Sequence, residues 1–162
     1  MGVTGHRPHK LAPKPACYSD ETLKQLIKLA YRHLKKLQPK QVVTGMALGW
    51  DMAIAIAALK LDIPVMAAVP FKGQESKWPL ISQKRYRLIL EKIKDNDGHV
   101  VIVSSGGYTA DKMLKRDKFI VKNSDLILAL WNGSSGGTAH TISIAKRAGR
   151  LIINAWFDWE NR

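Results

Sequence analysis

The sequence has little cysteine, few acidic residues and no long apolar run. Cys17 is the only cysteine among 162 residues, so no internal disulfide can form, and we expect a reducing, cytoplasmic setting. No stretch reaches the roughly 18 apolar residues that a membrane-spanning helix needs. The first residues also lack the basic start and apolar segment of a secretory signal. These absences predict a globular cytoplasmic protein without a membrane partner.

The shortage of acidic residues leaves a strong positive charge. Twenty-six Lys and Arg against 13 Asp and Glu give a formal net charge of +13. A field of this sign favours anionic partners, either phosphorylated small molecules or nucleic acid. The basic residues, however, follow the solvated faces of two expected helices at residues 24–36 and 84–94. An ordinary basic surface therefore stays open as an equal alternative to a nucleic-acid interface.

Short β-rich runs alternate with helical patterns, and no repeat, low-complexity tract or linker interrupts them. The expected strands cover residues 1–4, 41–44, 64–69, 99–104, 125–131 and 151–154. The expected helices cover residues 19–37 (capped by Ser19 or Asp20), 51–61, 79–95, 110–123 and 138–148. This alternation predicts one α/β domain over residues 1–162. Its expected architecture is a Rossmann-like three-layer fold, with a mostly parallel sheet of about six strands and helices on both faces.

Two segments depart from the ordinary pattern. Residues 5–19 contain Pro8, Pro13 and Pro15, which predict a loop rather than a helix. The expected helix at residues 51–61 is apolar on every side, which predicts burial on both of its faces.

In parallel α/β sheets, ligands bind outside the carboxyl ends of the strands, so the loops that follow strands are the candidate sites. The first such loop reads Thr4, Gly5, His6, Arg7. Gly5 would let the backbone approach a ligand closely, Arg7 can bind a phosphate with two parallel hydrogen bonds, and His6 can donate or accept near neutral pH. A plain turn with an exposed arginine is an equal alternative.

The second loop, residues 45–51, places Gly45 and Gly49 between a strand and a helix. Free N–H groups and the dipole of the helix N-terminus would favour an anion there. Asp51 suits the start of the helix, where it either only caps the helix or accepts a hydrogen bond from a ribose hydroxyl.

The third loop carries the strongest signal for a site. It follows the most apolar strand, opens a helix, and combines glycines with hydroxyl and amide side chains: Asn132, Gly133, Ser134, Ser135, Gly136, Gly137, Thr138. Successive backbone N–H groups in such a loop form a concave anion site, so residues 132–138 are expected to hold a phosphate.

Together these motifs resemble a known family. The matching stretches are residues 4–8 (TGHRP), residues 44–51 (TGMALGWD), and Ser124-Asp125 followed by Gly136-Gly137-Thr138. They resemble the YpsA-like branch of the SLOG superfamily, which also groups the DNA-processing protein DprA (Smf) and the LOG enzymes. The resemblance implies a Rossmann-like fold and a nucleotide-type ligand at the strand ends.

LOG enzymes cleave the N-glycosidic bond of nucleoside monophosphates. This sequence resembles the part of their motif that binds the ligand but departs from it at the catalytic glutamate. Arg116 has the matching distance to Ser124-Asp125, and Gly137-Thr138 matches the Gly-Thr of the family's glycine-rich turn. The position of the family's glutamate is His140, which cannot supply the negative charge that stabilises an oxocarbenium ion. This departure argues against LOG-type hydrolysis, unless the fold brings Asp51 or Asp117 near the glycosidic bond in place of the glutamate.

Three functional hypotheses follow. The favoured one is a domain that binds or senses a nucleotide or NAD-derived small molecule, with the phosphate on residues 132–138 and neutralised by Arg7 and Arg116. The alternatives are a LOG-like N-glycosidase and a DprA-like nucleic-acid binder. No resident cofactor and no metal site is expected, catalysis stays open, and a homo-oligomer is an open possibility.

Overall fold

The computed structural model describes residues 1–162, and a six-stranded sheet forms its centre. The strands are β1 (Gly2–Gly5), β2 (Val42–Thr44), β3 (Val65–Val69), β4 (His99–Ile102), β5 (Leu126–Leu130) and β6 (Leu151–Asn154). They lie in the order β4-β3-β2-β1-β5-β6, and every neighbouring pair is parallel. The predicted parallel sheet of about six strands is confirmed.

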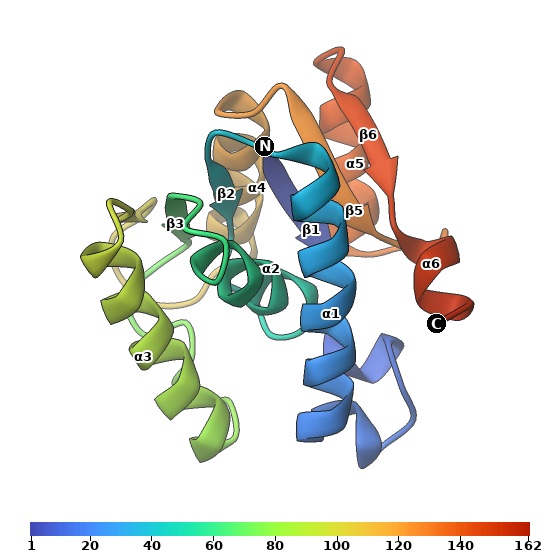
Figure 1. The fold of residues 1–162 in the computed structure, drawn as a ribbon. Coiled ribbons are helices and arrows are strands. Elements are labelled where there is room, and N and C mark those ends of the chain that lie inside the picture. Colours follow the sequence, from blue (N-terminus) through green and yellow to red (C-terminus); the bar gives the residue numbers. More distant parts are fainter.

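Helices cover both faces of this sheet. They are α1 (Asp20–Leu37), α2 (Trp50–Leu59), α3 (Leu80–Asp95), α4 (Ala110–Lys122), α5 (Gly137–Arg147) and the short α6 (Trp156–Glu160). The first three lie on one side of the sheet, whereas α4 and α5 lie on the other (Figure 1). This arrangement confirms the predicted Rossmann-like architecture. No helix is both long and apolar enough to span a membrane.

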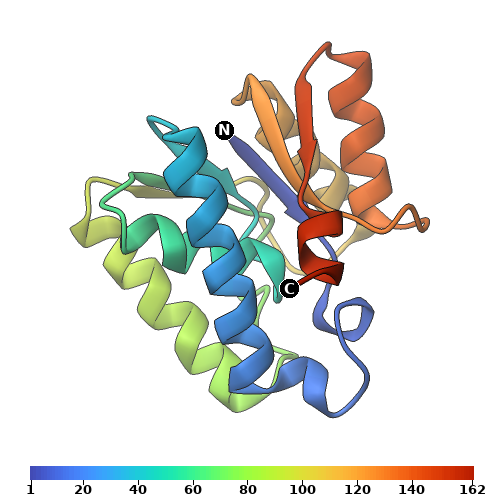
Figure 2. The same ribbon diagram turned by 45° about the vertical axis from the view of Figure 1, so that its right-hand side comes forward.

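The sequence pattern missed three short elements. Two 3-10 turns, η1 (Pro8–Lys10) and η2 (Ala16–Tyr18), lie within the segment expected to be a loop, and α6 follows the last strand. Each is too short to show a helical periodicity. Figure 2 shows that α6 lies beside the segment that follows β1, and the rings of Trp156 and His6 meet edge to face at 5.6 Å.

Side-chain caps set the start of two helices. The hydroxyl of Ser19 accepts a hydrogen bond from the backbone N–H of Thr22 at 3.1 Å, so Ser19 rather than Asp20 is the N-cap of α1. In the same way, the Thr109 hydroxyl accepts from the N–H of Lys112 at the start of α4.

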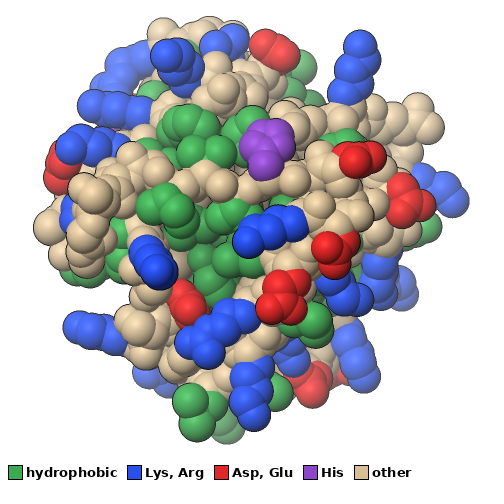
Figure 3. Space-filling model, turned by 90° about the vertical axis from the view of Figure 1, so that its left-hand side faces the viewer, with side chains coloured by type: hydrophobic (Ala, Val, Ile, Leu, Met, Phe, Trp, Pro, Cys, Tyr) green, Lys and Arg blue, Asp and Glu red, His purple; other side chains and the backbone are tan.

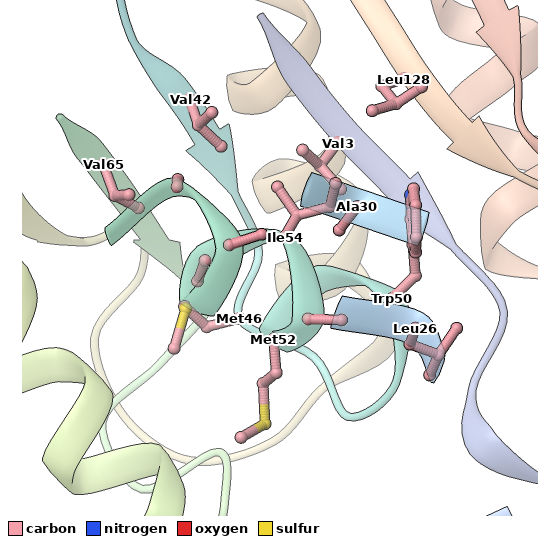
Figure 4. Packing of buried hydrophobic residues seen from close by; sticks show 14 of the residues in the cluster. Val3, Leu26, Ala30, Val42, Met46, Trp50, Met52, Ile54, Val65 and Leu128 are labelled. Atoms are coloured by element: carbon pink, nitrogen blue, oxygen red, sulfur yellow. The ribbon is translucent and has the colours of Figure 1, made fainter. Parts of the chain in front are cut away.

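Helix α2 is buried on both sides, as its composition predicts. It lies between the sheet and α1, so its side chains meet Val3 and Val42 of the strands as well as Leu26 and Ala30 of α1 (Figure 4). Ile54 in its middle is 0% exposed. Because α2 is packed on two sides, the loop before it is attached to a helix whose residues are mostly buried.

The strand order reverses between β1 and β5, and this reversal positions the site. These two strands pair in register from Gly2 with Ile127 to Gly5 with Leu130, so they end at the same level. The chain leaves β1 toward helices on one face and leaves β5 toward α5 on the other. A crevice therefore opens at the carboxyl ends of β1 and β5, where open α/β sheets bind ligands.

Candidate functional site

A cavity of about 480 Å³ lies at this reversal point. All three loops that follow β1, β2 and β5 contribute to it, and α4 forms a further wall. The volume lies within the range of about 300–1,000 Å³ that is typical of small-molecule sites. From the first loop, Thr4, Gly5, His6 and Arg7 all line the cavity.

The N-terminus of α5 opens into the cavity without a cap. Gly136 is the N-cap residue at φ 135°, a conformation that favours glycine, and no side chain caps the N–H groups of the first turn. The first backbone N–H that the helix satisfies is that of His140, which donates to the carbonyl of Gly136 at 3.0 Å. The N–H groups of residues 137–139 have no acceptor in the chain. Free N–H groups at a helix N-terminus are suited to binding an anion.

Arg7 faces the same cavity with a free guanidinium group. It lies two residues after the end of β1 and is half-buried, and its side chain makes no hydrogen bond or ion pair within the chain. Burial lowers the pKa of the Arg7 guanidinium, and nearby Asp51 partly offsets that effect. A partly desolvated arginine without a protein partner can bind an anionic ligand more strongly than one in open solvent.

Lys10 is a second cation at the site, which the sequence did not indicate. Turn η1 brings its Nζ to the glycine-rich loop, where it donates to Oγ of Ser134 at 2.8 Å and to the carbonyl of Ser135 at 2.9 Å. Lys10 lines the cavity as well. The position of Lys10 depends on turn η1, which lies in a proline-rich segment predicted to be a loop. No local sequence pattern therefore indicates that Lys10 reaches the cavity.

Arg116 of α4 lines the cavity but is engaged with the protein. Its Nε donates to Oδ1 of Asp117 at 2.8 Å, and its Nη1 donates to the carbonyl of Gly45 at 3.0 Å. A Cβ atom at Gly45 would lie 1.9 Å from that nitrogen. Gly45 therefore makes room for Arg116 and does not itself line the cavity.

Gly49 also lies outside the cavity lining. It is the N-cap residue of α2 at φ 96°, and a Cβ there would lie 2.7 Å from the carbonyl oxygen of His6. Its role is to let the second loop pack against the first.

Asp51 lies in the first turn of α2 and lines the cavity, although it is buried. Burial raises the pKa of Asp51 to about 6, against the opposing effects of Arg116 and Arg7. The backbone N–H of Ala47 donates to its Oδ2 at 3.5 Å. Burial also raises the pKa of Asp117, again opposed by Arg116. Acids with raised pKa values in a cavity are typical of functional sites.

His6 and Asn132 join the first and third loops. Nε2 of His6 lies 2.6 Å from Oδ1 of Asn132 and 3.1 Å from its backbone nitrogen, and that Oδ1 also accepts from the N–H of Ser134. The backbone N–H of Asn132 donates to this Nε2, and burial lowers the pKa of His6, opposed by its hydrogen bond with the Asn132 side chain. Asn132 and Gly133 lie outside the cavity lining. These hydrogen bonds hold the loop of residues 132–138 against the segment that follows β1.

At the glutamate position of the LOG pattern, His140 does not line the cavity. Its Nε2 is buried without a hydrogen-bond partner. The carboxylates that do line the cavity are Asp51 and Asp117, which come from α2 and α4.

The comparison with protein families decides the classification. The YpsA model, described as the YspA SLOG family, matches residues 1–149. The chain belongs to this family. The resemblance inferred from the three loop motifs is thereby confirmed.

A prophage protein is similar in sequence to this YpsA-family chain, and two DNA-processing proteins have a similar fold. The uncharacterized SPbeta prophage-derived protein YoqJ of Bacillus subtilis is 29% identical over 117 residues, which span 65% of this chain and 68% of YoqJ. DprA from Streptococcus pneumoniae superimposes with a TM-score of 0.64 at 19% identity, over 94% of this chain and 48% of DprA.

DprA from Helicobacter pylori, whose structure is described for its single-stranded DNA binding mode, gives a TM-score of 0.63 at 18% identity. The match covers 95% of this chain and 64% of that protein. The YpsA-family chain thus spans about half to two thirds of the DprA proteins, and at these identities the likeness concerns the fold.

Proposed function

We propose that the chain binds a nucleotide-type small molecule, with its phosphate at the N-terminus of α5. One observation carries the proposal: Gly137 and Thr138, whose N–H groups have no acceptor in the chain, line the same cavity as Arg7, whose guanidinium has no partner in the chain. Free backbone N–H groups at a helix N-terminus and an unpaired cation together suit a phosphate dianion.

The other predicted residues have supporting roles in this proposal. Thr138, at the start of α5, adds a hydroxyl to the phosphate site, and Arg116 adds positive charge from α4. Asp51 lies on the α2 side, where its carboxylate accepts a hydrogen bond from a sugar hydroxyl. The ligand would be a nucleotide or an NAD-derived molecule.

The test is direct binding to a panel of nucleoside monophosphates, NAD and ADP-ribose, measured by thermal shift and by calorimetry. A ligand that binds the folded state raises the melting temperature. Arg7→Ala should weaken binding about 10- to 100-fold, because a charge-assisted hydrogen bond contributes about 1.5–3 kcal/mol. Arg147→Ala is the matched control, since it removes the same charge from the far, exposed end of α5. No shift by any ligand at millimolar concentration would refute the proposal.

A second candidate is N-glycosidic cleavage, which the position of Asp51 favours. Its carboxyl lines the cavity with a pKa raised to about 6, a value suited to proton transfer near neutral pH. Incubation with nucleoside monophosphates and chromatography for the released base tests this candidate. Release by the native chain and none by Asp51→Asn would support it.

Nucleic-acid binding is the third candidate, supported by the charge of +13 and by the fold shared with H. pylori DprA. On the face drawn in Figure 3, the Lys and Arg side chains stand apart around apolar ones instead of forming one stripe. A phosphate-driven complex should weaken steeply with salt. Gel shifts of single-stranded DNA at low and at physiological salt would separate this candidate from the first.

A further inference from the structure

Tyr108 is an exposed aromatic residue at the cavity. It lies in the segment between β4 and α4 and is 68% exposed, yet it belongs to the cavity lining. Large aromatic rings that stay uncovered beside a cavity are candidates for ligand contact, because burying them against an apolar partner is favourable.

The ring is held in place although its surface is open. It meets the ring of Phe71 edge to face, with centroids 6.0 Å apart and an angle of 79°. Phe71 itself is only 6% exposed, so it is a fixed support. Nζ of Lys112 donates to the carbonyl of Gly107 at 2.6 Å, which ties the segment to α4. Tyr108 is thus presented at a defined position.

The neighbouring wall of the cavity is apolar. Ala110, Met113 and Leu114 of α4 line it together with Tyr108, and Leu114 is 38% exposed. The anion site at the start of α5 and the carboxyl of Asp51 belong to other parts of the same lining. The cavity therefore combines a site for a phosphate, a hydroxyl acceptor and an apolar surface with a free aromatic ring.

We infer that Tyr108 stacks on the base of the bound nucleotide and that the apolar wall of α4 completes the base site. This inference rests on the proposed function, and it adds the residue that distinguishes a nucleotide from a sugar phosphate. Stacking depends on ring area rather than on base edges, so all bases are accepted and purines are preferred over pyrimidines.

The experiment compares AMP, UMP and ribose 5-phosphate by calorimetry, because ribose 5-phosphate carries the phosphate and the sugar without a base. The native chain should bind AMP about tenfold more tightly than ribose 5-phosphate, with UMP between them. Tyr108→Ala should remove that advantage and change the affinity for ribose 5-phosphate less than twofold. Tyr108→Phe should retain the native order, since the ring and not the hydroxyl makes the contact.

Leu88→Ala, on α3 and outside this cavity, serves as a control for the loss of an exposed apolar side chain. If ribose 5-phosphate binds the native chain as tightly as AMP, or if Tyr108→Ala leaves AMP binding unchanged, the base site is refuted while the phosphate site stands. If none of the three ligands binds, the base site is refuted, and the proposed function is refuted as well when NAD and ADP-ribose also fail to bind.

Discussion

Replacing Asp51 by asparagine should stabilise the unliganded chain above pH 6. Asp51 is buried in the first turn of α2, and burial raises its pKa from 3.8 to about 6 despite Arg7 and Arg116 nearby. The raised pKa means that the charged carboxylate is less favourable in the folded chain than in the unfolded one. Asparagine has nearly the same shape, and its amide oxygen can still accept the N–H of Ala47.

The magnitude follows from that pKa. Each pKa unit corresponds to about 1.4 kcal/mol, so a rise from 3.8 to about 6 costs on the order of 3 kcal/mol when the group is fully charged. Between pH 4 and 6 the folded chain binds more protons than the unfolded chain, so its stability falls as the pH rises. The cost is absent below about pH 4 and complete above about pH 7.

The assay measures melting temperature and urea unfolding from pH 4 to 8. At pH 7.5, Asp51→Asn should melt roughly 6–12 °C above the native chain, since about 1 kcal/mol moves a domain of this size by 2–4 °C. At pH 4 the two should coincide. Asp111→Asn is the control, because it removes an acid that is 66% exposed and paired only with Lys115. Equal or lower stability of Asp51→Asn at pH 7.5 would show that burial does not penalise this carboxylate.

Three further predictions concern the packing of the site and of the core. Gly45→Ala places a Cβ atom 1.9 Å from Nη1 of Arg116, so the arginine must move. We expect a loss of about 1–3 kcal/mol in urea unfolding, because the buried guanidinium loses its hydrogen bond to the carbonyl of Gly45, to which Gln74 also donates at 3.2 Å; native stability would contradict this prediction. Gly136→Ala forces a non-glycine residue to φ 135°; it should cost about 1–3 kcal/mol in unfolding and weaken AMP binding in calorimetry, whereas unchanged affinity would mean that this backbone does not hold the phosphate. Ile54→Ala opens a cavity under α2 where the side chain is 0% exposed, so it should cost about 2–5 kcal/mol by the same unfolding assay, and less than 1 kcal/mol would indicate that the layers around α2 collapse to fill the space.

The alternation of strands and helices is local information, and the sequence alone determined it. Apolar strands of three to five residues, a helix start at Ser19 or Asp20 and the fully apolar α2 are visible in the order of residues. The meeting of the three loops also follows from the sequence, because parallel strands end at one edge of the sheet. The loop at Gly136 was recognisable for the same reason: a glycine between a strand and a helix leaves the helix N-terminus open.

Contacts between distant side chains were decided only by the tertiary structure. Gly45 and Gly49 were expected to face the ligand, but they make room for Arg116 and for the carbonyl of His6. Arg116 and Gly45 are 71 positions apart, so no periodicity or spacing encodes their hydrogen bond. The place of Tyr108 has the same origin, because the crossover from β4 at the edge of the sheet to β5 carries α4 and the loop before it to the cavity. Such side-chain pairs depend on how the helix layers pack against the sheet. The raised pKa of Asp51 depends on the same packing, because burial between these layers removes water from its carboxyl group.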